Sequence, residues 1–139
     1  MTDNNSLPSL SMKRLGSIVG WVATALLVLS NGFAAIMKFV PVETGSAAEL
    51  MGQRLGTIGL ERGLGVLEII ILILFLVPRT SVVGFILMTG YLGGALATQL
   101  THGMTQQELI PMYVILAVLA VCGYFRFPEF TARLKGKTV

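Results

Sequence analysis

The chain has little charge. Only 12% of its 139 residues are Asp, Glu, Lys or Arg, whereas 54% are hydrophobic. That charged fraction is about half of what a soluble domain carries. A small water-soluble domain must cover much of its surface with polar side chains, and this chain has too few of them. The composition therefore predicts a protein whose main solvent is lipid.

Cysteine and histidine are almost absent, with one residue of each, Cys122 and His102. A single cysteine excludes a disulfide framework, an iron–sulfur cluster or a multi-cysteine zinc site within the chain, and we predict no metal site. The sequence also has no nucleotide-binding loop and no activated nucleophile. The absence of these features argues against stand-alone enzyme activity, although a partner protein can supply catalysis.

Apolar residues dominate four stretches of the chain. Each is a continuous run of ~19 residues or more, which as a helix rising 1.5 Å per residue crosses the ~30 Å hydrocarbon core of a bilayer. Barrel strands would instead need ~10 residues of alternating polarity. Pro78 and Arg79 end the second run, and the short gap before the third requires an antiparallel hairpin. The predicted helices cover residues 15–40, 59–77, 82–100 and 109–127.

We therefore predict an all-α fold, an integral membrane four-helix bundle with up-and-down antiparallel topology over residues 15–127. Residues 1–14, rich in small polar residues, are predicted to be a disordered tail, and residues 128–139 a basic tail. Lys13 and Arg14 before an apolar run are also typical of a secretory signal peptide. The first run is longer than such a signal, which favours an uncleaved helix.

The longest loop, residues 41–58, contains a helix start signal. Ser46 and Glu49 have the spacing of a capping box. Leu50, Met51 and Leu55 recur on one side of the helix that would follow. We predict a short interfacial helix between helices one and two, lying over the bundle. An irregular surface loop is the alternative.

The basic residues predict the orientation in the membrane. Seven of the ten precede helix one, join helices two and three, or follow helix four, whereas Lys38, Arg54 and Arg62 fall on the opposite side. The seven are Lys13, Arg14, Arg79, Arg126, Arg133, Lys135 and Lys137. Because Lys and Arg concentrate in cytoplasmic loops, we predict that both termini are cytoplasmic. This asymmetry explains the net charge of +3 without a nucleic-acid partner.

Polar residues inside the apolar runs are costly in a membrane and mark candidate functional sites. Glu68 lies near the middle of helix two and shares one stripe of it with Glu61 and Gly65. Polar residues of helices one and three fall at matching depths, and together they predict an outward-facing pocket. The predicted pocket residues are Asn31, Lys38, Glu61, Glu68, Tyr91, Thr98, Gln99 and His102. The inner half of the bundle is predicted to be nearly featureless.

Two interpretations of Glu68 remain open. It can carry a proton or hydrogen-bond a ligand such as a quinone ring or another small amphiphile. Alternatively, it pairs with Lys38, or hydrogen-bonds to Asn31 or Tyr91, and only fixes the register of the helices.

Other candidates also have structural interpretations. Glu61 is typical of anchoring at a membrane interface, and His102 suits an exposed turn as well as a ligand site. Gly65, Gly90 and Gly94 are predicted helix-packing positions, because small residues let helices approach closely. Gly90 and Gly94 can serve packing within the chain or the contact of a homodimer.

Several short motifs between residues 61 and 103 point to a family. They are Gly-Val-Leu-Glu at 65–68, Val-Pro-Arg-Thr at 77–80, Thr-Gly-Tyr-Leu-Gly-Gly-Ala-Leu-Ala-Thr at 89–98 and His-Gly at 102–103. On these motifs the chain resembles the DoxX-like family, and the likeness extends to Asn31, Gly32 and Lys38. The resemblance implies a small four-helix protein of the bacterial cytoplasmic (inner) membrane. In many relatives the position of Gln99 looks like histidine, so its absence here argues against a two-histidine metal or haem site.

The resemblance also implies a function. The family takes its name from a subunit of a thiosulfate:quinone oxidoreductase, which implies a link to quinones or to sulfur redox chemistry. We accordingly predict a quinone-linked or other redox accessory subunit, with quinone as its cofactor, the lipid bilayer as its surroundings and a membrane or redox protein as its partner. The alternatives are a small proton-coupled transporter that uses Glu68, and a scaffold or assembly partner without a ligand.

Overall fold

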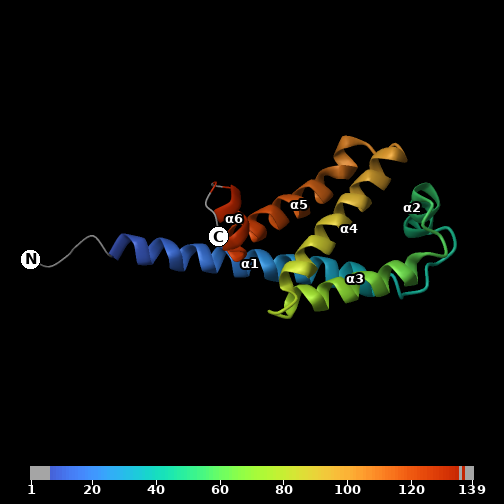
Figure 1. Ribbon diagram of the computed structural model, residues 1–139. Helices are drawn as coiled ribbons and strands as arrows, with labels where there is room; N and C mark the ends of the chain where they lie inside the picture. Colours follow the sequence, from blue (N-terminus) through green and yellow to red (C-terminus); the bar gives the residue numbers. More distant parts are fainter. Residues whose placement is uncertain (1–6, 135, 137–139) are drawn as a thin grey trace, which may run out of the picture.

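The computed structural model describes residues 7–134 and 136, which form helices and turns and contain no strand. The predicted all-α class is confirmed (Figure 1). The six helices are α1 (Leu7–Met37), α2 (Ala47–Leu55), α3 (Glu61–Leu76), α4 (Ser81–Thr101), α5 (Gln106–Arg126) and α6 (Pro128–Leu134).

The four long helices form two pairs that meet at one end of the molecule and part at the other (Figure 1). Helices α1 and α3 lie alongside each other, while α4 and α5 slant away from them on the side where α2 lies. Helix α1 packs against both α3 and α5, α3 against α4, and α4 against α5. This splayed arrangement differs from the regular bundle predicted from the sequence, because the two pairs are in close contact over only part of their length.

A core of buried side chains from all four long helices holds the pairs together. Phe75 of α3, Leu27 of α1 and Cys122 of α5 are almost completely buried in it. Outside this core, large apolar side chains are widely exposed, among them Leu29 at 70% and Phe33 at 69%. Soluble monomers rarely expose apolar patches of more than a few hundred Å². The exposed apolar surface therefore identifies a membrane protein whose outer surface faces lipid.

Three helical segments of the described chain are long and apolar enough to cross a bilayer: Met12–Met37, Ser81–Thr101 and Gln106–Arg126. Helix α3 is shorter, and its 16 residues correspond to a length of about 24 Å. Its apolar character matches the second predicted span, but its ends lie inside the predicted limits of 59 and 77.

Both ends of the chain contain more helix than the sequence predicts. Helix α1 begins at Leu7, although we predicted a disordered tail to residue 14. Pro8 lies in the first turn of α1, where the missing N–H removes no helical hydrogen bond. Pro128 likewise starts α6, where a tail was predicted. The predictions for residues 1–6, 135 and 137–139 lie outside the described residues.

The predicted short helix between the first two long helices is present as α2. The Ser46 side chain accepts a hydrogen bond from the backbone N–H of Glu49, at 3.2 Å. The Glu49 carboxylate, however, accepts from the backbone N–H of Gly45 at 2.6 Å rather than from that of Ser46. At the other end, Gly56 adopts the left-handed conformation, with φ of 65°, and closes the helix.

Glycine at position 84 permits the tight hairpin of α3 and α4. A Cβ atom on Gly84 would overlap the backbone of Phe75 and Leu74. Similarly, a Cβ on Gly123 of α5 would press on the ring of Phe85. Neither glycine was among the predicted packing positions, because their surroundings follow from how the helices cross rather than from a spacing in the sequence.

Candidate functional site

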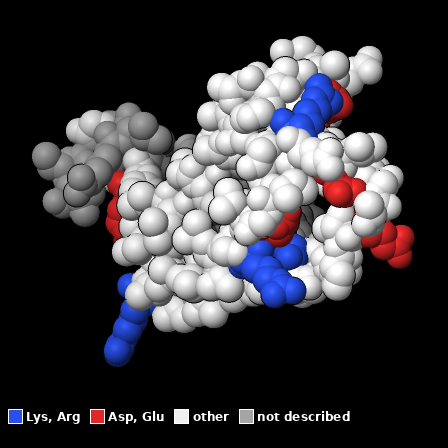
Figure 2. All heavy atoms as spheres, turned by 90° about the vertical axis from the view of Figure 1, so that its right-hand side faces the viewer, with Lys and Arg blue, Asp and Glu red and all other residues white. Residues whose placement is uncertain are grey.

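A cavity of about 710 Å³ lies where the helices part, and α2 forms one of its walls. Its lining is mostly apolar and includes residues of each of the helices from α1 to α5. Figure 2 shows the molecule from this end. Charged atoms occupy only a few places on a largely uncharged surface, and a hollow opens beside one group of acidic and basic atoms.

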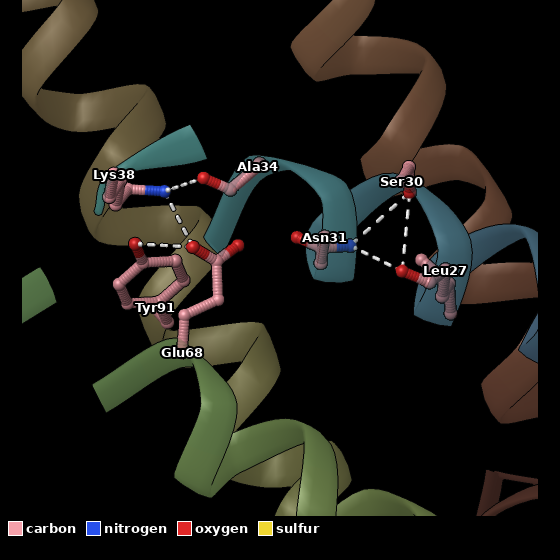
Figure 3. A network of polar contacts seen from close by, with 7 residues as sticks. All are labelled: Leu27, Ser30, Asn31, Ala34, Lys38, Glu68 and Tyr91. Carbon is pink, nitrogen blue, oxygen red and sulfur yellow. Dashed lines mark hydrogen bonds and ion pairs between the residues drawn. The ribbon is translucent and has the colours of Figure 1, made fainter. Parts of the chain in front are cut away.

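Three polar side chains, one from the turn that follows α1 and one each from α3 and α4, meet in this cavity (Figure 3). The Lys38 ammonium lies 2.6 Å from Glu68 Oε2, and the Tyr91 hydroxyl donates to the same oxygen at 3.3 Å. Lys38 Nζ also donates to the backbone oxygen of Ala34 at 3.3 Å. We refer to Lys38, Glu68 and Tyr91 as the carboxylate cluster.

Gly65 explains how Lys38 reaches Glu68. It lies one helical turn before Glu68 and is buried against α1. A Cβ atom at Gly65 would be 3.2 Å from both the Lys38 Cβ and the backbone oxygen of Ala35. The missing side chain therefore lets α1 approach α3 closely enough for the ion pair to form.

The charges of the cluster are unequally buried. The side chain of Glu68 is 4% exposed and that of Lys38 is 25% exposed. A carboxylate buried this deeply requires a counter-ion, and Lys38 supplies it. The two charges of the pair balance each other, and Lys38, the more accessible partner, keeps a third N–H group for a further hydrogen bond.

Seven of the eight predicted pocket residues line the cavity. Besides the carboxylate cluster, these are Asn31, Glu61, Thr98 and Gln99. Asn31 does not join the cluster, because its amide nitrogen is turned the other way and donates to the Leu27 oxygen at 2.9 Å (Figure 3). The Thr98 hydroxyl is used within its own helix, where it donates to the Gly94 oxygen at 3.0 Å.

His102 is the predicted pocket residue that the structure places elsewhere. It is exposed in the turn after α4 and is not part of the cavity wall. Its Nδ1 atom lies 2.8 Å from the backbone oxygen of Thr98. The histidine thus lies at the end of its own helix, as in the exposed-turn interpretation.

The surroundings of Gly90 and Gly94 differ from the prediction. An added Cβ would meet no atom within 4 Å at either residue, so no neighbouring helix packs closely against them. Both residues line the cavity instead. Since α4 diverges from α1 and α3 here, these glycines widen the cavity rather than bring helices together.

An ion pair missed in the sequence joins α2 to the first turn of α5. Arg54 Nη1 lies 2.9 Å from Glu108 Oε1, and Nη2 donates to the backbone oxygen of Gly103 at 2.7 Å. Glu108 is held in place by a capping box with Thr105 at the start of α5. The spacing of Thr105 and Glu108 was a visible signal for this cap, whereas nothing in the sequence paired Arg54 with Glu108.

The half of the molecule that was predicted to be nearly featureless contains polar contacts of Arg126. Arg126 turns back into the helices, where Nη1 donates to Thr24 Oγ1 and Nη2 to the Phe75 backbone oxygen, both at 3.2 Å. Thr24, only 2% exposed, also contacts Cys122 Sγ at 3.4 Å. Sequence reasoning counted Arg126 only as a charge beside the membrane and did not consider that its long side chain can fold back along α5.

The described residues contain no group of three His, Cys, Asp or Glu side chains that could hold a metal ion. The polar groups of the cavity instead suit a ligand with hydrogen-bond acceptors and apolar parts. No curated protein and no solved structure matches the chain. A family model matches residues 22–121, which include α2, α3, α4, about half of α1, most of α5 and the whole carboxylate cluster. Since this match covers most of the sequence, the chain is a membrane protein of the DoxX-like family.

Proposed function

We propose that the protein binds a quinone or a similar small amphiphile in the cavity between its helices, as an accessory subunit of a redox system without stand-alone catalysis. The observation that carries this proposal is the carboxylate cluster, three polar side chains at one place in an otherwise mostly apolar cavity. A quinone has matching chemistry, with an apolar ring and carbonyl oxygens that accept hydrogen bonds.

The cluster has donors left for such a ligand. A lysine ammonium has three N–H groups, and in the described chain Lys38 uses two of them, toward Glu68 and Ala34. The third can donate to a carbonyl oxygen. Tyr91 OH can turn from Glu68, 3.3 Å away, to the ligand. The volume of about 710 Å³ falls within the range of roughly 300–1,000 Å³ that is usual for small-molecule sites.

The ion pair favours ligand binding over proton-coupled transport. A carboxylate that carries protons must alternate between its charged and neutral forms. Glu68 lies 2.6 Å from the Lys38 ammonium, and this ion pair would have to be broken and re-formed in every cycle. The transporter alternative therefore requires Lys38 to leave Glu68 in each cycle, which binding does not.

We further propose that α1, α3, α4 and α5 all cross the bacterial inner membrane, with both termini in the cytoplasm. Lys13, Arg14, Arg79 and Arg126 belong to segments at the end of the molecule away from α2 (Figure 1). The positive-inside rule assigns that end to the cytoplasm. The cavity and α2 would then face the extracytoplasmic side, and the shorter α3 would be matched by local thinning of the bilayer.

The experiment measures quinone bound to the protein. The detergent-purified chain is incubated with a quinone, washed and extracted, and the quinone is quantified by mass spectrometry. Tyr91→Phe should lower the bound fraction at subsaturating quinone by about two- to tenfold, because one hydrogen bond of roughly 0.5–1.5 kcal/mol is removed. Tyr113→Phe removes the same hydroxyl from an exposed position outside the cavity and should leave binding unchanged.

Glu68→Gln separates the proposal from its alternatives. Under our proposal this variant loses quinone, because the neutral amide no longer holds the Lys38 ammonium in place as a counter-ion, whereas Glu43→Gln in an exposed loop does not. A wild-type protein that retains no quinone would refute the proposal. A proton-driven flux in proteoliposomes that disappears with Glu68→Gln would support the transporter instead.

A further inference from the structure

A second cavity, of about 640 Å³, lies at the opposite end of the molecule. It is bounded by the first half of α1, the turn between α3 and α4, the end of α5 and the start of α6. In Figure 1 this is the region where α6 and the end of α5 approach α1. None of its lining residues belongs to the first cavity.

Arg126 is a partly buried cation on the wall of this second cavity. Its guanidinium carbon lies 4.7 Å from the ring centre of Phe75, 5.1 Å from that of Trp21 and 5.6 Å from that of Phe127. The two acceptors that it meets, Thr24 Oγ1 and the Phe75 oxygen, are uncharged. Among the described residues, no carboxylate lies within ion-pair distance of it. Desolvation of a charge is costly without a counter-ion, so the site is suited to an external anion.

The rest of the wall is also suited to an anion with an apolar part. Lys13 adds a second positive charge, and Ser17 adds a hydroxyl. One acidic residue, Glu129, lines the same cavity, which leaves two basic side chains against one acidic side chain. Trp21 is exposed on α1 beside the cavity, and tryptophan is enriched at the headgroup level of membranes.

We propose that this cavity binds a phosphate group, and that the phosphate is the headgroup of an anionic phospholipid. Arginine is suited to phosphate oxygens because its planar fork can donate two parallel hydrogen bonds. The exposed apolar side chains of Ile18 and Val22 on the same helix provide a surface for the acyl chains. This lipid site is independent of the quinone proposal and shares no residue with it.

The test compares lipid binding by the full-length protein. Purified protein in detergent is mixed with phosphatidylglycerol or phosphatidylcholine of identical acyl chains, and bound lipid is measured by native mass spectrometry. The wild type should prefer phosphatidylglycerol. Lys13→Gln should weaken this binding about fivefold, since one basic residue near a headgroup contributes ~1 kcal/mol. Arg126→Gln should weaken it further.

The matched control is Arg79→Gln. Arg79 is an exposed basic residue of the turn between α3 and α4, and it does not line the cavity. Equal losses for Lys13→Gln and Arg79→Gln would indicate diffuse attraction and overturn the site, as would equal binding of the two lipids by the wild type. Displacement of phosphatidylglycerol by millimolar inorganic phosphate would assign the site to free phosphate and overturn its assignment to lipid. If Arg126→Gln does not fold, Lys13→Gln decides, because Lys13 is exposed.

Discussion

Glu68 and Lys38 depend on each other for stability as well as for the proposed binding. Each carries a charge into a largely apolar region, and each is the other's counter-ion. Removing one partner of a buried ion pair leaves an uncompensated charge, whereas removing both can be nearly neutral. The ion pair is therefore a better target for a double-mutant cycle than for single substitutions.

We predict that Lys38→Met destabilises the protein by about 2–4 kcal/mol, somewhat below the usual cost of breaking a buried pair because Lys38 is partly exposed. Glu68→Gln should cost less, since the remaining Lys38 can reach water. The double variant should be more stable than Lys38→Met alone. Unfolding in mixed micelles, followed by circular dichroism, measures all three. Strictly additive losses would contradict the coupling.

The sequence predicted the members of the carboxylate cluster and offered Lys38, Asn31 and Tyr91 as alternative partners of Glu68. Spacing placed Glu68 on one stripe with Gly65, and depth placed Tyr91 at the same level. The sequence could not decide whether Asn31 or Lys38 contacts Glu68, because that depends on how far each side chain extends from its own backbone. Lys38 is long enough to reach Glu68, whereas Asn31 is short and bonds within α1. The contacts of Arg126 were not predicted for the same reason, because they depend on the reach of a long side chain.

At the scale of helices, glycines have two opposite roles in this protein. At Gly84 the backbone of the neighbouring helix occupies the space that a side chain would take. At Gly93 and Gly94 the corresponding space is open. A small-residue pattern in the sequence does not distinguish these cases, because both are glycines on apolar helices. Only the crossing geometry decides which glycine faces a neighbour.

We expect Gly84→Ala to destabilise the protein by about 1–3 kcal/mol, the usual cost of an overpacked core. The added methyl would meet rigid backbone of Phe75 and Leu74, which cannot move aside as a side chain can. Gly93→Ala on the same helix is the control. It is exposed, has open space and does not line the cavity. Its higher helix propensity should leave stability equal or raised by up to ~1 kcal/mol. Equal losses in both variants would refute the packing argument.

At the scale of the whole molecule, the number of membrane crossings is decided by α3. Three segments satisfy the length and hydropathy of a span, and α3 is too short to be counted with them. Apolar runs in the sequence predicted four helices, and four long helices are present. The splay between the pairs was not predictable, because hydropathy reports which residues avoid water but not the angle at which helices cross.

Single-cysteine labelling distinguishes three crossings from four. In a Cys122→Ser background, Glu43→Cys lies before α3 and Arg79→Cys lies after it, and both positions are exposed. With four crossings and cytoplasmic termini, a membrane-impermeant maleimide added to intact cells should label position 43 and not position 79. Labelling of both positions from outside would show that α3 does not cross. Labelling of position 79 alone would reverse the proposed orientation.

The attachment of α2 has a consequence for how a ligand enters the cavity. This helix has no buried residue of its own. It is joined to the first turn of α5 by Arg54, through an ion pair with Glu108 whose two side chains are 40% and 35% exposed. Exposed ion pairs contribute little to stability and weaken as salt screens them. The wall formed by α2 is thus the part of the cavity that is most easily displaced, and under the proposed function a higher ionic strength should speed the entry and release of the ligand.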